Sequence, residues 1–357
     1  MTRTRTDTQV VIIGAGQAGL AVAYFLRRFE LVPGTDFIIY DRGPSTGGAW
    51  QHRWDALKLG SAHHVNDLPG MAELGLSFDT ADRQLPARDI VAGYYRRYEQ
   101  HYDLRVHRPV TVSSVFDRGA DLVVQHTEGE TGTRVVVNAS GTWGAPFVPY
   151  YPGVNTFAGR QVHTSSYVSA SEFAGQSVVV VGGGTSAIGF LLELENVAAS
   201  VVWATRRPVE FRDESELTLE GGVAAVAAQD AAARAGGALP SIVSGTGVPR
   251  TRRIAAGIER GLLVERPMFS AIEPGGVRWP DGSFTAADAI VWATGFRPEL
   301  RHLAPLKLRE KAGGLTVASG ASWQDPRIFL AGYGPQASTI GANRAGRVIA
   351  RQIMAQL

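Results

Sequence analysis

The stretch that decides the fold is VVIIGAGQAGL, at residues 10–20. Its first four residues are β-branched and leave no polar face, which predicts a central parallel strand buried on both sides. The glycines that follow, Gly14, Gly16 and Gly19, have the spacing G-x-G-x-x-G. In that spacing the first glycine permits a tight turn, the second lets a pyrophosphate approach the backbone, and the third lets a helix pack closely on the strand. The stretch therefore predicts a strand, a phosphate-binding turn and a helix.

The same pattern returns at residues 178–188, VVVVGGGTSAI, where Ala187 takes the place of the third glycine. Each copy leads to a second apolar strand, FIIY at residues 37–40 and VVWA at residues 201–204. Two such openings predict an α/β protein with two dinucleotide-binding Rossmann-like domains. We expect one domain to comprise residues 1–150 and 288–357, and the other, residues 151–287, to be inserted into it.

In each predicted domain, the residues just after the second strand indicate which dinucleotide binds. Asp41 follows this strand in the first domain and is suited to accept hydrogen bonds from ribose hydroxyls, with a surface turn carboxylate as the alternative. Arg206 and Arg207 follow it in the second domain, where a guanidinium fork matches a 2′-phosphate. This favours NADP(H) over NAD(H), and two solvated arginines are the alternative. Two dinucleotide sites in one chain imply electron transfer between a flavin and a nicotinamide.

Composition excludes several classes of protein. The 357 residues include no cysteine, which excludes disulfides, thiolate metal sites, iron–sulfur clusters and dithiol relays. The 35 Lys and Arg against 33 Asp and Glu leave a net charge of +2, so neither nucleic acid nor a membrane surface is an expected partner. The apolar stretch near the N-terminus is too short to span a bilayer, and we expect a cytoplasmic protein. His63, His64 and Asp67 lack the spacing of zinc ligands, so no metal is expected, and a homodimer is left open.

A second motif narrows the reaction. Residues 157–167, FAGRQVHTSSY, match the pattern F-x-G-x-x-x-H-x-x-x-(Y/F), and the chain here resembles the class B flavin-dependent monooxygenases, the flavin-containing monooxygenase family, and its short bacterial members. The resemblance implies FAD in the outer domain, NADPH in the inserted one, with NADH also open, and O2 as co-substrate. It further implies transfer of one oxygen atom, through a C4a-(hydro)peroxyflavin, to a small soft nucleophile such as a thioether or an amine. Ketones are less favoured, because Tyr167 and Val168 stand where Baeyer–Villiger members tend to have Trp followed by Pro or Asp.

The resemblance also assigns cofactor contacts. Residues 47–50, GGAW, are similar to the family's flavin-contacting G-G-x-W, and residues 334–340, GPQASTI, are similar to its C-terminal flavin-contacting turn. Together with the glycine turns, these motifs predict the following cofactor-binding residues: Gly14, Gly16, Gln17, Ala18, Gly19, Asp41, Arg42, Gly48, Trp50, Gly182, Gly184, Thr185, Ser186, Arg206, Arg207, Gln336, Ser338 and Thr339. His163 of the second motif is expected to have a structural role.

Candidate catalytic residues follow from a departure from the family. N- and S-oxygenating members usually place an Asn beside the flavin, where Ala62 stands in this chain. We expect Ser61 and Asn66 to take the role of this Asn as catalytic residues. The next candidates for that role are Tyr333 and Gln336 in the C-terminal turn. The alternative functions are an NAD(P)H-dependent flavoprotein reductase that does not oxygenate a substrate, and a nucleotide-sensing module. An Ala-rich helix within residues 217–247 is predicted as either a surface excursion or a mobile cover.

Overall fold

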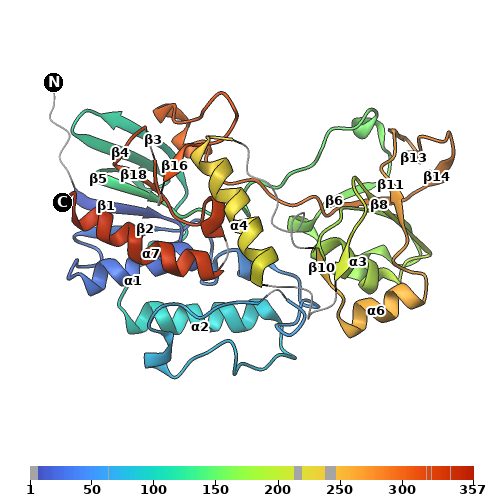
Figure 1. Ribbon diagram of the computed structural model, residues 1–357, viewed down its shortest axis with the longest axis horizontal. Helices are drawn as coiled ribbons and strands as arrows, with labels where there is room; N and C mark the ends of the chain where they lie inside the picture. Colours follow the sequence, from blue (N-terminus) through green and yellow to red (C-terminus); the bar gives the residue numbers. More distant parts are fainter. Residues whose placement is uncertain are drawn as a thin grey trace. The chain divides into compact units, whose positions relative to one another are not determined.

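The computed structural model describes residues 7–62, 64–212, 219–237, 247–318, 320–322, 324–337 and 339–357. The chain divides into two compact units, shown in Figure 1. The first comprises residues 1–144, 226–240 and 298–357, and the second comprises residues 145–225 and 241–297.

The strand predicted at the N-terminus, β1 (Thr8–Ile13), is central to the sheet of the first unit. It pairs in parallel with β2 on one side and β5 on the other. Val10 and Ile12 face one hydrophobic cluster, whereas Val11 and Ile13 face another. Because both faces of the strand are buried, its run of apolar residues has no polar alternation. The described strands of this sheet are β16 (Val317–Ala318), β17 (Ala321–Ser322), β18 (Ile328–Leu330), β5 (Gly129–Asn138), β1, β2 (Phe37–Tyr40), β3 (Val112–Arg118) and β4 (Asp121–His126).

Three helices lie on one side of this sheet in Figure 1: α1 (Gln17–Arg28), α2 (Ala87–His101) and α7 (Thr339–Met354). The glycine at position 346 lets α7 approach α1, because a Cβ there would lie 2.9 Å from the Cβ of Ala21. The C-terminal helix therefore packs directly on the helix that begins at the first glycine turn.

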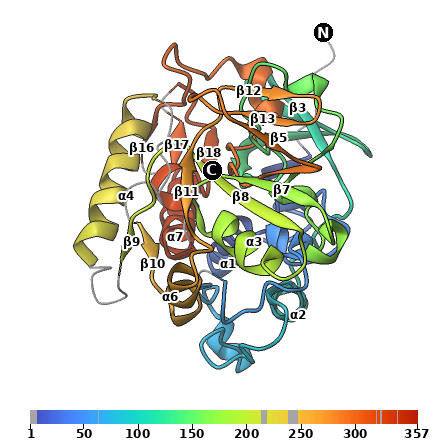
Figure 2. The same ribbon diagram turned by 90° about the vertical axis from the view of Figure 1, so that its right-hand side faces the viewer.

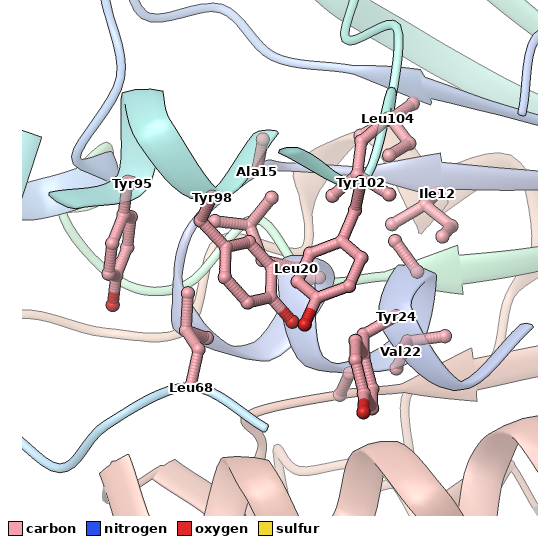
Figure 3. Packing of buried hydrophobic residues seen from close by; sticks show 14 of the residues in the cluster. Ile12, Ala15, Leu20, Val22, Tyr24, Leu68, Tyr95, Tyr98, Tyr102 and Leu104 are labelled. Atoms are coloured by element: carbon pink, nitrogen blue, oxygen red, sulfur yellow. The ribbon is translucent and has the colours of Figure 1, made fainter. Parts of the chain in front are cut away.

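A cluster of tyrosines joins α1 to α2, as Figure 3 shows. The ring of Tyr102 meets those of Tyr24 and Tyr98 edge to face, with centroids 5.1 and 4.8 Å away. The Tyr98 hydroxyl donates to the carbonyl of Pro69 at 2.7 Å, and the Tyr102 hydroxyl donates to Glu73 at 2.9 Å. These bonds fasten the segment that precedes α2 to the core of the first unit.

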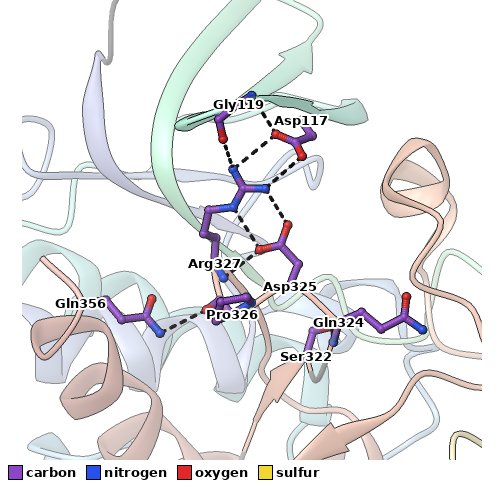
Figure 4. A network of polar contacts seen from close by, with 8 residues as sticks. All are labelled: Asp117, Gly119, Ser322, Gln324, Asp325, Pro326, Arg327 and Gln356. Atoms are coloured by element: carbon purple, nitrogen blue, oxygen red, sulfur yellow. Dashed lines mark hydrogen bonds and ion pairs between the residues drawn. The ribbon is translucent and has the colours of Figure 1, made fainter.

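A polar network fixes the start of β18, as Figure 4 shows. The guanidinium of Arg327 donates to Asp325 at 2.8 Å and to the carbonyl of Gly119 at 2.7 Å, and it lies 3.2 Å from Asp117. Gly119 lies in the turn between β3 and β4. One side chain thus joins two parts of the sheet that are distant in sequence.

The second unit has a parallel sheet in which the second glycine motif follows a central strand. Figure 2 shows β8 between β7 and β11, and the full order of described strands is β11 (Glu265–Pro267), β8 (Ser200–Thr205), β7 (Ser177–Val181), β15 (Ala289–Trp292) and β6 (Arg160–His163). The other described α-helices and strands that lie wholly in this unit are α3 (Thr185–Leu194), α6 (Arg252–Glu259), β9 (Phe211–Arg212), β10 (Val248–Pro249), and the antiparallel β12 (Ala271–Glu273), β13 (Gly276–Arg278) and β14 (Phe284–Ala286). Its described 3₁₀ helices are η3 (Val154–Thr156), η4 (Thr164–Ser166) and η5 (Ala170–Phe173).

The compact units differ from the expected domains at three places. The first stretch of the first unit ends at residue 144 rather than 150. The chain returns to the first unit at residue 298 rather than 288, because β15 pairs with β6 and β7 in the second sheet. Residues 226–240, predicted in the inserted domain, belong to the first unit. They include the end of α4 (Leu219–Arg234), where Ala233 is buried in a cluster with Leu308 and Leu315.

Candidate cofactor sites

The first glycine turn is shaped by contacts within the protein. Gly14 has φ +106°, and a Cβ there would collide with the carbonyl oxygen of Ala139. A Cβ on Gly19 would collide with the carbonyl oxygen of Gly14. Gly16 differs, because it has φ −87° and its Cβ would have only the Cα of Gly48 nearby, at 3.8 Å. The fold itself therefore requires the first and third glycines, whereas the second leaves space at the turn.

The second turn repeats this construction. Gly182 has φ +140°, and a Cβ there would collide with the carbonyl oxygen of Ala293. The amide of Gly14 donates to the last residue of β2 at 2.7 Å, and the amide of Gly182 donates to Ala204 of β8 at 3.0 Å. The tripeptides Ala-Ser-Gly at 139–141 and Ala-Thr-Gly at 293–295 are alike because each brings a carbonyl oxygen against a glycine turn.

Both turns end at a helix N-terminus that no side chain caps among the described residues. Gly16 is the N-cap of α1 and Gly184 is the N-cap of α3. The first N–H groups of a helix have no partner within the helix, and an anion is a suitable acceptor for them. Thr185 and Ser186 open α3, and Gln17 and Ala18 open α1, as the sequence predicts.

A cavity of about 520 Å³ lies in the first unit beside its glycine turn. This volume is in the range of small-molecule and cofactor pockets. Its walls come from the turn, from the 3₁₀ helix η1 (Gly48–His52), from residues 139–143 and from residues 299–302. The predicted residues that line it are Gly14, Gly16, Gln17, Ala18, Asp41, Arg42, Gly48 and Trp50.

Asp41 is held at the end of β2 by the backbone. Its Oδ2 accepts from the amide of Ala15 at 2.6 Å, and its Oδ1 accepts from the amide of Gly43 at 2.7 Å. The residue is 8% exposed, so it is not a surface turn carboxylate. Its carboxylate lies in the wall of the cavity, where the fixed geometry suits a polar ligand group.

Another part of the wall holds a buried polar network that the sequence analysis missed. Glu299 lies 3.7 Å from the guanidinium of Arg42 and 3.1 Å from that of Arg301. Nε2 of His302 lies 2.8 Å from Oδ1 of Asn138, and burial lowers the pKa of this imidazole to about 4. His302 is therefore neutral near pH 7. Glu299 and His302 follow the return of the chain to the first unit, and no motif marks them.

Arg53 lines the cavity too, although no sequence motif indicates it. Its guanidinium carbon lies 4.5 Å from the ring centroid of Trp143 and 5.7 Å from that of Trp50. Its Nε is buried and has no hydrogen-bond partner among the described residues. Burial lowers the pKa of Arg53 to about 10. The contact with Trp143 spans distant parts of the sequence, which is why no local pattern indicates it.

Gln17 connects the helix start to two other segments. Its Nε2 donates to Oδ1 of Asn343 on α7 at 2.9 Å and to the carbonyl of Asn66 at 3.1 Å. Its Oε1 accepts from the hydroxyl of Tyr95 on α2. The carbonyl of Asp67 accepts from the side chain of Asn343 at 2.6 Å. This network holds the loop of the catalytic candidates against the first glycine turn.

The catalytic candidates lie outside the cavity wall. Ser61 is exposed and donates its hydroxyl to the carbonyl of Lys58 at 3.1 Å. Asn66 lines a neighbouring hollow with Asn343 and four charged or titratable residues, His64, Asp67, Asp79 and Arg344. Tyr333, a later alternative, is buried and its hydroxyl accepts from the amide of Leu315 at 3.1 Å.

The two arginines predicted to recognise a 2′-phosphate are exposed just after β8. Neither Arg206 nor Arg207 forms an ion pair with a described carboxylate. This position suits a phosphate ligand as well as solvation.

His163 fills a structural position in the second unit. Its Nδ1 accepts from the amide of Ser165 at 3.1 Å, and its Nε2 lies 3.0 Å from the carbonyl of Gly295. With Nδ1 as acceptor, Nε2 carries the proton and donates. The motif histidine therefore ties β6 to the Ala-Thr-Gly segment that supports the second glycine turn.

Some predicted residues cannot be placed by their side chains. Gln336 lies in the 3₁₀ helix η7 (Gly334–Ala337) and Thr339 begins α7, while their side chains, together with Ser338 and His63, lie outside what the structure describes. Among the described residues, no three His, Asp or Glu side chains form a group that could hold a metal ion. None of the helices in the described part of the chain has the length and apolar character needed to cross a membrane.

Comparison with known proteins yields related oxidoreductases. The pyridine nucleotide-disulphide oxidoreductase family matches residues 11–221. A double mutant of a flavin monooxygenase from Stenotrophomonas maltophilia is similar in structure, with a TM-score of 0.82, 33% identity and coverage of 99% of both chains.

Two curated proteins match part of the chain. An uncharacterized oxidoreductase of Bacillus velezensis, CzcO, is 28% identical over 56% of this chain and 56% of its own. Senecionine N-oxygenase of Tyria jacobaeae is 26% identical over 57% of this chain and 48% of its own. The matches thus span about half the length of these curated relatives.

Proposed function

The chain belongs to the pyridine nucleotide-disulphide oxidoreductase family, and from that membership we propose that it is an NADPH-dependent FAD monooxygenase. Its substrate is a small soft nucleophile, a thioether or an amine, and a ketone is less favoured. The similarity to a bacterial flavin monooxygenase along 99% of both chains supports the reaction class. The curated N-oxygenase relative supports an amine or a related soft centre as the acceptor of oxygen.

The polar groups in the wall of the first unit's cavity match those of FAD, and this match supports the proposal. The cavity contains an open edge at Gly16, the uncapped start of α1, a backbone-held carboxylate at Asp41 and a buried guanidinium nitrogen at Arg53 without a described partner. A pyrophosphate accepts hydrogen bonds from helix N–H groups and from arginine, whereas ribose hydroxyls donate to a carboxylate. Each of these features therefore has a counterpart in the dinucleotide.

Each residue has a separate task in this arrangement. The amides at the start of α1 bind the pyrophosphate, and Asp41 accepts from the adenosine ribose. Trp50 and Gly48 of η1, with Gly47 before it, shape the wall that excludes water. When bound, FAD supplies the acceptance of hydride and the activation of dioxygen. The protein orients the reactants and keeps the site dry, so it needs few acid–base groups of its own.

The second glycine turn is assigned to NADPH. Gly182 and Gly184 form the turn, the start of α3 supplies N–H groups for the pyrophosphate, and Arg206 or Arg207 binds the 2′-phosphate. Arginine suits this role because its planar fork matches phosphate oxygens.

Ser61 and Asn66 remain the proposed residues that favour oxygen transfer over loss of hydrogen peroxide. The hydrogen bond between Gln17 and the Asn66 carbonyl supports this assignment, because it ties their loop to a residue in the cavity wall. Hydrogen-bond donors near the reacting flavin edge would delay release of peroxide.

The test uses labelled dioxygen. The protein is purified, saturated with FAD, and supplied with NADPH, oxygen-18 gas and either methyl phenyl sulfide or N,N-dimethylaniline. We expect one labelled oxygen atom in the sulfoxide or N-oxide, detected by mass spectrometry, with cyclohexanone as the comparison ketone. If one molecule of hydrogen peroxide forms for each NADPH consumed and no labelled sulfoxide or N-oxide appears, the protein is a flavoprotein reductase or oxidase instead.

A further inference from the structure

We propose that Arg53 binds the pyrophosphate of the dinucleotide in the first unit, as a cofactor-binding residue that the glycine motif does not include. The proposal rests on the proposed function in so far as that cavity holds FAD. It is carried by two observations: Arg53 lines the cavity beside the glycine turn, and its buried Nε has no hydrogen-bond partner among the described residues.

The backbone places Arg53 close to the expected phosphate position. Arg53 is the C-cap of η1, and its amide donates to the carbonyl of Trp50 at 3.0 Å. The same short helix begins at Gly48, which has φ +53° and packs so closely on the turn that a Cβ would lie 2.8 Å from the Cα of Gly16. Because a pyrophosphate approaches the backbone at Gly16, the segment that carries Arg53 borders its binding place.

Aromatic contacts hold the guanidinium within the wall. Trp143 lies 4.5 Å and Trp50 lies 5.7 Å from its central carbon. Cation–π contacts of this length stabilise an arginine without using its N–H donors. The donors therefore stay available for an anion.

The other arginines of the wall are already paired. Arg42 and Arg301 both contact the carboxylate of Glu299. Asp41, the other carboxylate in the wall, accepts from two backbone amides, and neither of its oxygens comes within hydrogen-bond distance of Arg53 in the described structure. Arg53 has no described carboxylate partner, and burial lowers its pKa, as expected of a cation held without an anion. Among the described residues, the wall thus has no negative charge paired with Arg53.

The chemistry of FAD identifies the missing anion. The oxidised isoalloxazine and the adenosine are neutral, whereas the pyrophosphate carries two negative charges. A planar guanidinium matches phosphate oxygens, and charge-assisted bonds of this kind are stronger than neutral ones. An anionic ring exists only after reduction, so it would not account for binding of oxidised FAD.

The test measures binding of oxidised FAD to the whole protein after removal of bound flavin. Flavin fluorescence gives the dissociation constant for wild type, Arg53→Met, Arg53→Lys and Arg97→Met. Arg97 is an exposed arginine on α2 and provides a matched control for removal of one positive charge. Calorimetry with ADP-ribose, which has the pyrophosphate but no flavin ring, provides a second probe. The melting temperature of each flavin-free variant reports whether it folds.

We expect Arg53→Met to raise the dissociation constants of FAD and ADP-ribose by about 10- to 150-fold, which corresponds to loss of one charged hydrogen bond. Arg53→Lys should recover part of this loss and Arg97→Met should bind like wild type. Equal binding of both probes by a folded Arg53→Met and by wild type would overturn the proposal. A loss for FAD alone would also overturn it, because it would place Arg53 at the flavin ring. Failure of the wild type to bind FAD would instead reject the proposed function.

Discussion

Gly14 and Gly16 belong to one motif, but the structure predicts that alanine at the two positions has different consequences. At Gly14, φ is +106° and the new Cβ meets the carbonyl oxygen of Ala139, so both the backbone conformation and the contact are unfavourable. At Gly16, φ is −87° and the nearest heavy atom is 3.8 Å away, an ordinary contact distance. The first substitution should damage the fold, and the second should damage ligand binding.

The expected magnitudes follow from these contacts. A residue in a sparsely populated backbone region costs about 1–3 kcal/mol, and overpacking costs about 1–3 kcal/mol more. Gly14→Ala should therefore lower the free energy of unfolding by about 2–6 kcal/mol, or the melting temperature by roughly 5–20 °C. Gly16→Ala should change the free energy of unfolding by less than about 1 kcal/mol, because loss of a favourable N-cap glycine opposes the lower entropy of the unfolded chain. In the proposed binding mode its Cβ enters the space of the pyrophosphate, and displacing one charged hydrogen bond should weaken FAD binding by about 10- to 150-fold.

The assay combines thermal melting of the flavin-free variants with titration of FAD by flavin fluorescence. Gly75→Ala is the matched control, because Gly75 has φ +65° and its Cβ would meet nothing within 4 Å. It reports the cost of the left-handed conformation alone, about 1 kcal/mol. The reasoning is refuted if Gly16→Ala melts as early as Gly14→Ala, or if a stable Gly16→Ala binds FAD as tightly as wild type.

Three further predictions concern the coenzyme, acid stability and coupling. At least one of Arg206→Ala and Arg207→Ala should raise the KM for NADPH about tenfold or more and leave that for NADH unchanged, because a guanidinium binds a 2′-phosphate that NADH lacks. An unchanged ratio of the two KM values in both variants, measured in steady-state assays, would contradict the assignment. Burial lowers the pKa of His302 from 6.5 to about 4, so the unfolded chain takes up this proton first as the pH falls. His302 should therefore lower the free energy of unfolding by up to about 3 kcal/mol between pH 6.5 and 4. Urea titrations of His302→Gln should show a decrease that is smaller by this amount, with unchanged contributions from the other histidines whose pKa is lowered in the folded protein. Ser61→Ala and Asn66→Ala should each increase the hydrogen peroxide formed per NADPH in a peroxidase-coupled assay, and unchanged coupling in both would exclude them as catalytic residues.

The sequence was sufficient for the two Rossmann-like units, because each opens with four β-branched residues and a glycine turn, a signal that is local and repeated. It was insufficient for the boundary near residue 288. The apolar run before Ala293 resembles the run before Ala139, and local pattern does not say which sheet a strand joins. The structure supplies the rule that was missed. Each glycine turn needs its own carbonyl neighbour, Ala139 for Gly14 and Ala293 for Gly182, so the later run belongs to the second unit.

The cavity wall was predictable where a local motif marks it. Gly14, Gly16 and Asp41 line the cavity because their positions follow from the order strand, turn, helix, strand, and Trp50 lines it as part of the G-G-x-W segment. Arg53 and Glu299 reach the same wall from segments without regular periodicity, and their contacts with Trp143 and Arg42 join residues far apart in sequence. The contacts of Arg53 and Glu299 are therefore tertiary, and no local motif indicates them.

The third position of the motif is glycine in the first turn and alanine in the second, a difference of one methyl group. A Cβ at Gly19 would collide with the carbonyl oxygen of Gly14, whereas Ala187 at the equivalent place of the second turn is fully buried with its Cβ present. Helix and turn cannot have the same separation in both units, since the same added atom overlaps in one and fits in the other. The closer approach in the first unit brings the start of α1 directly against the turn. The contrast in sequence between glycine and alanine at the third position therefore reflects how tightly each helix packs on its strand, and the tighter of the two belongs to the cavity proposed to hold FAD.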